Sequence, residues 1–502
     1  MFKNKTIFIL FLIVLFCGIF IRSYDLGWEP LGFGEVEVYQ SAEEFLKGNF
    51  TKNFYIFAET PLMKYIFTLF MFLFSPPVEI ALRLVSVLFG ALSIILVFFF
   101  TKKIYNDEWL ALIASTITAF SIIHIELSRY IQIETALSFF YLAVFYIFWN
   151  FIHNRNNKNA VLLGIIVGLG VLIKTAFINA IITVLIIALL YKIISFKIKP
   201  NFSISIDNKL IKAAILAVIV FFIVWPLSLF PLSMNAIINI EGTTNEINAD
   251  VPTFLLVFGY RLTNVGGAVT DNFFLNIPII GHFFFFLVKE SFFFIALFFI
   301  GIYSIIKRFV RGSDSYIITI ISIFFILMWL QHFRYTYRYI AIIIPFLSII
   351  AARSIHGIKP FITNKIKSIE KHFNILFLII IILVMLITSI IASPNYALYY
   401  NEARGLFDIP DSEGVFGEGM KNVIENIENC NSVLTENYYV FMIEPYYPGL
   451  SSIDDENADC VVKGLTMDVK NIIVNNHIEE NTCNLKTTIT KKGTDLFEIY
   501  EC

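Results

Sequence analysis

Long apolar stretches dominate this chain and limit the folds open to it. A bilayer core of roughly 30 Å needs about 20 apolar residues per crossing helix. We count eleven stretches near this length, at about residues 6–23, 82–101, 110–126, 133–152, 160–177, 178–194, 211–230, 280–305, 316–332, 339–355 and 373–393. With 58% hydrophobic and 15% charged residues, the chain is typical of a protein surrounded by lipid. The sequence therefore predicts a mainly α-helical, polytopic membrane bundle of about eleven spans.

The distribution of Lys and Arg predicts which way the bundle faces. Lys and Arg gather at every second junction between stretches, where 19 of the 37 basic residues fall. Cytoplasmic loops collect these residues, so we expect a cytoplasmic amino terminus held by an uncleaved first anchor. An odd number of crossings then places the carboxyl-terminal stretch outside the membrane. The apolar segment 62–75 is too short to cross, and we expect it to lie along the interface.

The end of the chain differs from the rest in composition. We expect a membrane domain over residues 1–393 and a small extracytoplasmic α+β domain over residues 394–502, where short polar and apolar runs alternate. Four of the five cysteines lie in this last part, at Cys430, Cys460, Cys483 and Cys502. Outside the cytoplasm, two disulfides are plausible for them, and three pairings are open. The alternative is that they are small buried apolar side chains.

An acidic cluster follows the first apolar stretch. Glu35 and Glu37 precede Tyr39, and Glu59 comes later in the same external segment. A carboxylate buried at the bilayer edge has a raised pKa, which suits a general base, so we predict that Glu35 or Glu37 is catalytic. The alternative is that the two glutamates, which alternate about Val36, form the solvated face of an extended loop.

Charged residues also stand at the outer ends of several later stretches. Arg83, Arg129, Lys174 and Arg338 are cations at this level, and Glu134 is a carboxylate beside them. Cations there suit a lipid-linked phosphate, because Arg and Lys form charge-assisted hydrogen bonds with phosphate oxygens. The predicted chemistry is the transfer of a group from a phosphorylated lipid. Glu134 could instead pair with Arg129 as a structural turn, and the cations could simply snorkel to the interface.

The order of the motifs resembles that of a known family. The motifs are Glu35 to Tyr39, Thr60-Pro61-Leu62, Arg83-Leu84-Val85-Ser86, Ser128-Arg129 through Glu134, Gly168 through Lys174, Arg338-Tyr339 with Pro345, Pro394 through Glu402, and Phe416-Gly417-Glu418-Gly419. They resemble motifs of the C-superfamily integral-membrane glycosyltransferases, specifically the dolichyl-phosphate-mannose protein mannosyltransferase and aminoarabinose transferase group. Three departures stand out: the leading Asp of the first motif is replaced, Glu59 stands where the family often has His or Lys, and Glu134 replaces an Asp.

The resemblance implies an inverting sugar transfer on the external face of the cell membrane. The donor would be a polyprenyl (dolichyl) phosphate sugar, and the acceptor a protein, a glycan or a lipid. It implies that Glu35 or Glu37 is the catalytic base, and Glu134 is a further candidate catalytic residue. It also implies that the substrate is bound by Tyr39, Glu59, Arg83, Arg129, Lys174 and Arg338. The site residues include no metal ligand, and a divalent metal requirement stays open.

Two other functions share these features. An oligosaccharide or polymer ligase has the same fold and would take a larger donor. A lipid or sugar transporter (flippase) would use charges at the membrane edge to line a path. The net charge of −2 gives no indication of a nucleic-acid partner.

Overall fold

The protein is described by a computed structural model. It describes residues 4–27, 29, 31–48, 61–74, 77–198, 208–226, 237–240, 243–246, 278–307, 312–330, 337–393, 396, 399, 401, 420–435, 443, 451–452, 458–464, 474, 478, 483–491 and 494–502. At some of these positions, Glu37 and Tyr337 among them, only the backbone is described. Glu59 and the motif at 416–419 lie outside the described residues.

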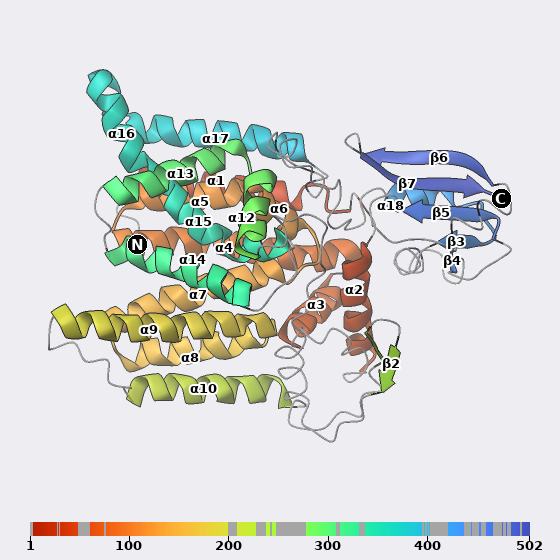
Figure 1. Ribbon diagram of the computed structural model, residues 1–502, viewed down its shortest axis with the longest axis horizontal. Helices are drawn as coiled ribbons and strands as arrows, with labels where there is room; N and C mark the ends of the chain where they lie inside the picture. The colour runs from red at the N-terminus through yellow and green to blue at the C-terminus, as the bar shows by residue number, and fades with distance from the viewer. Residues whose placement is uncertain are drawn as a thin grey trace.

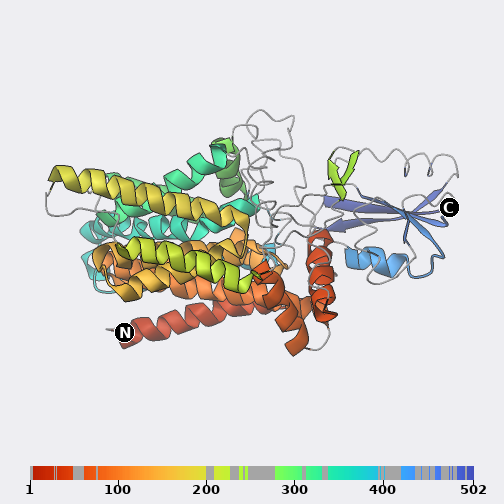
Figure 2. The same cartoon turned by 90° about the horizontal axis from the view of Figure 1, so that it is seen from below.

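Helices packed side by side form the body of the molecule, and most of the long ones have roughly parallel axes (Figures 1 and 2). They are α1 (Lys5–Ser23), α4 (Val78–Tyr105), α5 (Glu108–Phe120), α6 (Ile122–Arg129), α7 (Glu134–His153), α8 (Asn157–Val171), α9 (Ile178–Ile198), α10 (Asn208–Val224), α13 (Phe292–Lys307), α14 (Gly312–Leu330), α15 (Ile344–Ala352) and α17 (Phe373–Ala392). Shorter elements join them: η1 (Thr175–Phe177), α12 (Pro278–Lys289), η3 (Tyr337–Ile342), α16 (Ser354–Lys365) and η4 (Lys367–Ile369).

Each predicted apolar stretch overlaps at least one of these helices. Within the described residues, four helices are long and apolar enough to cross a membrane, namely α1, α4, α7 and α17. The bent pair of α5 and α6 makes a fifth if it counts as one span. The predicted stretch 280–305 is not one helix, because the chain breaks at Glu290 and Ser291 between α12 and α13. The chain is thus a multi-pass membrane protein, and eleven crossings stay a prediction.

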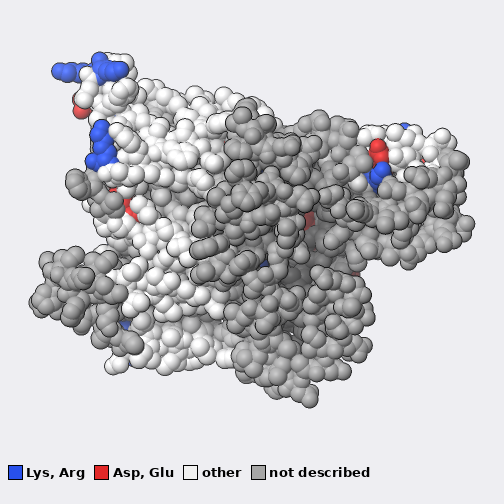
Figure 3. All heavy atoms as spheres, viewed as in Figure 1, with Lys and Arg blue, Asp and Glu red and all other residues white. Residues whose placement is uncertain are grey.

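Burial separates the centre of the bundle from its edge. Every side chain of α5 from Leu110 to Phe120 is buried, whereas α1 and α17 expose large apolar side chains such as Phe16 (69%) and Ile390 (63%). Exposed apolar faces of this kind suit lipid contact. Figure 3 shows the described surface of the bundle almost free of charge, with Lys and Arg gathered at the end where α16 projects.

Two short helices lie at the opposite end of the bundle from α16 (Figure 1). α2 (Phe33–Leu46) carries the acidic cluster, so Glu35 and Glu37 lie on a helix and not in an extended loop. α3 (Pro61–Leu73) is the short apolar helix predicted to lie along the interface, and its axis is inclined to the bundle in both views. The amide of Leu62 donates to the carbonyl of Leu172 at 3.0 Å, which ties the start of α3 to the end of α8.

A mixed sheet with one helix forms the carboxyl-terminal part, which we call the C-terminal module. It contains α18 (Met420–Asn426), β3 (Val433–Thr435), β4 (Ser451–Ser452), β5 (Cys460–Gly464), β6 (Asn484–Lys491) and β7 (Thr494–Glu501). The strand order is β4-β3-β5-β7-β6, with β3 parallel to β4 and β5 and the other pairs antiparallel. The two expected disulfides are confirmed and join Cys430 to Cys460 and Cys483 to Cys502. A separate two-stranded hairpin pairs β1 (Ile237–Ile240) with β2 (Thr243–Glu246).

Candidate active site

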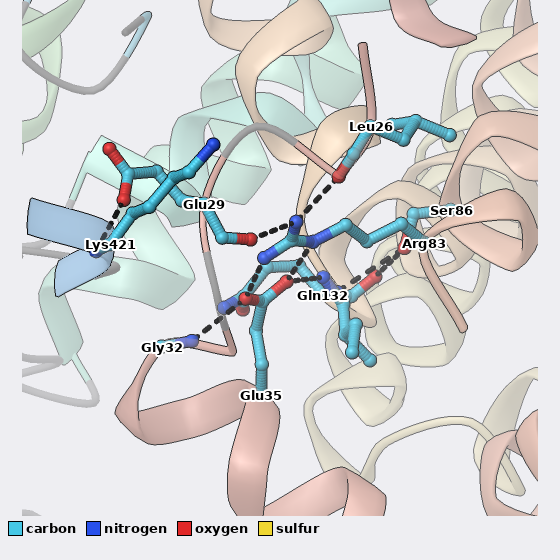
Figure 4. Close-up of polar contacts among 9 residues, drawn as sticks. Leu26, Glu29, Gly32, Glu35, Arg83, Ser86, Gln132 and Lys421 are labelled. Atoms are coloured by element: carbon cyan, nitrogen blue, oxygen red, sulfur yellow. Dashed lines mark hydrogen bonds and ion pairs between the residues drawn. The ribbon is translucent and has the colours of Figure 1, made fainter. Parts of the chain in front are cut away.

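A buried ion pair between Glu35 and Arg83 lies at the centre of the candidate site (Figure 4). Glu35 is in the first turn of α2, and Arg83 is in α4. Arg83 Nε donates to Glu35 Oε1 at 3.0 Å, and Nη2 donates to Oε2 at 2.6 Å. Both residues have a relative exposure of 0%. This two-point geometry is the strongest form of Arg–carboxylate contact.

Two backbone amides complete the shell around the Glu35 carboxylate. Gly32 N donates to Oε2 at 2.9 Å, and Ile131 N donates to Oε1 at 2.7 Å. Each oxygen therefore accepts two N–H groups, which matches its two lone-pair positions. A carboxylate so engaged would have to break one of these bonds to accept a proton from a substrate.

Arg83 also fixes the segment that leads from α1 to α2. Its Nη1 donates to the carbonyls of Leu26 at 2.6 Å and Glu29 at 2.9 Å. Arg83 was predicted to bind substrate, and the structure places its donors on groups of the protein. The guanidinium shapes the loop that carries the acidic cluster.

The turn between α6 and α7 is held against the same pair. Ser86, one turn of α4 beyond Arg83, donates to the carbonyl of Gln132 at 3.2 Å and accepts from its amide at 3.3 Å. Together with the bond from Ile131 to Glu35, this fixes the residues just before α7. The motifs Arg83 to Ser86 and Ser128 to Glu134 are therefore in direct contact.

A second buried ion pair joins Glu134, the first residue of α7, to Lys174. Lys174 Nζ lies 3.0 Å from Glu134 Oε1 and 5.7 Å from the centroid of the Tyr339 ring. Arg338 of η3 acts electrostatically on the same carboxylate. Glu134 pairs with Lys174 and does not form the turn with Arg129 that was considered from the sequence. Glu134, Lys174 and Arg338, all predicted site residues, thus come together although they are far apart in the chain.

Glycines bring the end of α8 close to its neighbours. A Cβ at Gly168 would lie 2.7 Å from the carbonyl oxygen of Ala217 in α10, and a Cβ at Gly170 would overlap the ring of Phe177. Side chains at these positions would push apart the segments that hold Lys174. The glycines of this motif are explained by close packing.

Arg129 lies at the end of α1 rather than in an open space. Its Nη1 donates to the carbonyls of Ile21 at 2.9 Å and Tyr24 at 2.6 Å, and the guanidinium lies over the ring of Tyr396 at 5.5 Å. It therefore satisfies carbonyl groups that are left unpaired where α1 ends. Tyr396 belongs to the motif Pro394 through Glu402, so this motif also reaches the cluster.

The axes of α5 and α6 meet at an angle of 55° where the span breaks. The charged residues that stabilise this break were not predicted from the sequence. Arg22 donates to the carbonyls of Thr118 at 3.2 Å and Ala119 at 2.7 Å, at the end of α5. Glu290 accepts from the hydroxyl of Ser121 and from the amides of Ile122 and Ile123 at 3.1 and 3.2 Å, at the start of α6. A cation thus meets the carbonyl end of one helix, and an anion meets the amide end of the next. The signal available in the sequence was that Arg22 and Glu290 each lie inside a predicted apolar stretch.

The remaining predicted residues are placed as follows. Glu37 lies two positions after Glu35 in α2, and successive positions on an α-helix differ by about 100°, so the two are about 200° apart around its axis. Tyr39 is half-buried in α2, and burial, with the charge of Glu43, raises the pKa of its hydroxyl. Lys64 of α3 is an additional buried cation that the sequence analysis missed. Among the described residues, no group of three His, Cys, Asp or Glu side chains is placed to hold a metal ion.

These features define a class: a multi-pass helical membrane protein with a charged cluster at one end of its bundle, beside a small α/β module. Residues 58–227 match the family described as dolichyl-phosphate-mannose-protein mannosyltransferase. No curated protein matches the chain. The resemblance drawn from the order of the motifs is confirmed by this match together with the fold.

Solved structures share the fold. ArnT from Cupriavidus metallidurans in the apo state is 13% identical, with a TM-score of 0.54 and coverage of 98% of this chain and 97% of that one. The apo oligosaccharyltransferase of Archaeoglobus fulgidus is 14% identical, with a TM-score of 0.53 and coverage of 88% of this chain and 64% of that one. The chain therefore spans less than two thirds of that oligosaccharyltransferase.

Two further structures of these proteins contain lipid phosphates. The Archaeoglobus fulgidus oligosaccharyltransferase AglB has been solved with an inhibitory peptide and a dolichol-phosphate (13% identity, TM-score 0.54, 92% of this chain and 70% of that one). Cupriavidus metallidurans ArnT has been solved bound to undecaprenyl phosphate (12% identity, TM-score 0.50, 98% of this chain and 97% of that one). At these identities the likeness shows the fold.

Proposed function

We propose that this protein is a membrane glycosyltransferase that moves a sugar from a polyprenyl (dolichyl) phosphate to an acceptor on the external face. The single observation that carries the proposal is the convergence of separate motifs. Arg83 and Ile131 meet at the Glu35 carboxylate, and Glu134, which follows Ile131 closely in the chain, pairs with Lys174. The match of residues 58–227 and the lipid phosphates bound by proteins of the same fold support a lipid-linked donor.

Of the two candidate bases, we assign Glu37 by elimination. Glu35 already accepts four N–H groups and is fully buried, which favours a positioning role for it. Glu37 would take the proton from an acceptor hydroxyl as the acceptor oxygen attacks the anomeric carbon. The bond between that carbon and the phosphate oxygen breaks, and the polyprenyl phosphate leaves with the electron pair. A single displacement of this kind inverts the anomeric configuration.

We assign the phosphate to the group around Glu134. Lys174 and Arg338 concentrate positive charge at this carboxylate, and a leaving phosphate gains negative charge as the bond breaks. Arg129 then supports the site by binding carbonyls at the end of α1, and Arg83 by binding carbonyls of the segment before α2. Tyr39 and Glu59 stay predicted substrate contacts. The acceptor can be a protein, a glycan or a lipid.

A transporter is less well supported. A broken span such as α5 with α6 is a feature of transport proteins, whose exposed helix ends bind the cargo. Here the ends at the break are occupied by Arg22 and Glu290, which are both fully buried. The break is therefore stabilised by the protein itself. A ligase for larger glycans is supported only by the fold that this chain shares with the Archaeoglobus fulgidus oligosaccharyltransferase.

One experiment distinguishes sugar transfer to an acceptor from transport of the lipid-linked sugar across the bilayer. The purified chain is reconstituted in liposomes with a mixture of peptide, glycan and lipid acceptors. One sample receives radiolabelled polyprenyl-phosphate monosaccharides, and a parallel sample receives radiolabelled lipid-linked oligosaccharides. Label appearing on an acceptor supports the proposed function. Label that crosses the bilayer on an unchanged donor supports a transporter. Label that moves only from lipid-linked oligosaccharides supports a ligase.

A further inference from the structure

Glu29 joins the candidate site to the C-terminal module. It lies in the segment between α1 and α2 and has a relative exposure of 2%. Its Oε2 accepts from the backbone amide of Lys421 in α18 at 3.0 Å. Its own carbonyl accepts from Arg83, which holds Glu35. One residue therefore touches both the module and the buried ion pair (Figure 4).

The module side of this contact is firmly built. Met420, Val423 and Ile427, from α18 and the turn after it, are fully buried in the hydrophobic core of the module with strand residues such as Val433 and Phe497. The disulfide from Cys430 to Cys460 ties the segment after α18 to β5. A displacement of the sheet would therefore carry the Lys421 amide with it.

The chain entering the module is also fixed to the bundle. Asn401 Nδ2 donates to the carbonyls of Leu287 and Glu290, both at 2.7 Å. The backbone N–H of Asn401 donates to the carbonyl of Val288 at 2.8 Å. Glu290 in turn supports the start of α6, and α6 leads to Ile131 beside Glu35. Two separate contacts therefore link the carboxyl-terminal part to the elements around the ion pair.

We propose that Glu29 is a positioning residue through which the C-terminal module helps to set the first turn of α2. The bond matters because a carboxylate that accepts a backbone N–H is a strong, directional contact, and Glu29 itself is buried. Movement of the module, for example when an acceptor binds, then shifts Glu29, Arg83 and the acidic cluster together. The consequence for catalysis rests on the proposed function, whereas the mechanical coupling does not.

Four variants isolate the contact. Lys421→Pro removes the donating N–H at the second residue of α18, where the helix itself does not use that group. Lys421→Ala is the matched control, because it removes the side chain and keeps the N–H. Glu29→Ala removes the acceptor, and Glu29→Gln keeps a carbonyl oxygen that can still accept. All four proteins are measured as full chains in lipid nanodiscs by hydrogen exchange of peptides covering residues 31–46.

We expect exchange in the first turn of α2 to be about fivefold faster in Lys421→Pro and in Glu29→Ala, corresponding to the loss of one hydrogen bond. Lys421→Ala should match the wild type, Glu29→Gln should lie nearer to it, and combining Lys421→Pro with Glu29→Ala should add little. Unchanged protection of α17 excludes general unfolding. Equal exchange in Lys421→Pro and Lys421→Ala, or full additivity in the double variant, would overturn the coupling. The measurement needs no turnover, so an inactive wild type would refute only the proposed function.

Discussion

Replacing Glu35 with Gln tests whether this residue holds the site together. The side chain keeps its shape but loses its charge and one acceptor oxygen. Four N–H groups now converge on the carboxylate, from Arg83 (two), Gly32 and Ile131. A glutamine offers one carbonyl oxygen and one amino group, so about two of the four donors would face another donor.

The magnitude follows from the burial of the pair. Both partners are fully buried, and breaking such a pair from one side costs about 3–5 kcal/mol, because a charge is left without its counterpart. Arg83→Met should cost at least as much, since the carbonyls of Leu26 and Glu29 also lose their donor. The double variant should cost less than the sum of the two single variants, by about 2 kcal/mol.

The assay is the free energy of unfolding in mixed detergent and SDS micelles, measured for the wild type, the two single variants and the double variant. Lys47→Gln is the control, because the Lys47–Glu43 pair at the end of the same helix is exposed and should contribute little to stability. The reasoning is refuted if Glu35→Gln is as stable as the control, or if the single effects add without coupling.

Three further predictions concern the supports of the site and the module. Gly170→Ala should destabilise the protein by about 1–3 kcal/mol, seen in the same unfolding assay, because the new methyl group overlaps the ring of Phe177; an unchanged stability contradicts this packing. Lys174→Met should weaken binding of a polyprenyl phosphate at least tenfold in a direct binding assay, whereas Lys174→Arg should retain most of it; equal loss in both argues against a charge role. Replacing Cys430 and Cys460 together by Ser should cost the module about 3 kcal/mol, visible as earlier proteolysis on heating, and equal resistance with and without the bond would count against it.

The helices of the bundle were predictable because length and apolarity alone determine which segments suit a bilayer. The same property hid the break at Glu290, since one carboxylate inside a long apolar stretch hardly changes the average. α2 was missed because its sequence mixes valines, glutamates and glycine and has no long apolar face. Its position depends on the buried pair with Arg83, which is 48 residues further along the chain.

The residues of the candidate site were predictable from their order, but their partners were not. Arg83 and Arg129 have the charge expected of phosphate ligands. The structure places Arg83 on the Glu35 carboxylate and on carbonyls of the segment before α2, and Arg129 on carbonyls where α1 ends. The sequence shows that an arginine side chain can donate hydrogen bonds. It does not show which acceptor groups the fold places beside that side chain. Glu134 and Lys174 were both singled out, yet their contact joins the start of α7 to the segment after α8.

The most direct test of the account is single-turnover sugar transfer by Glu37→Gln, compared with the wild type at equal donor occupancy. A general base contributes about 10²–10⁴ in rate. We predict a loss of this size with binding of the lipid-phosphate donor unchanged. Full transfer activity in Glu37→Gln would contradict the assignment of the base.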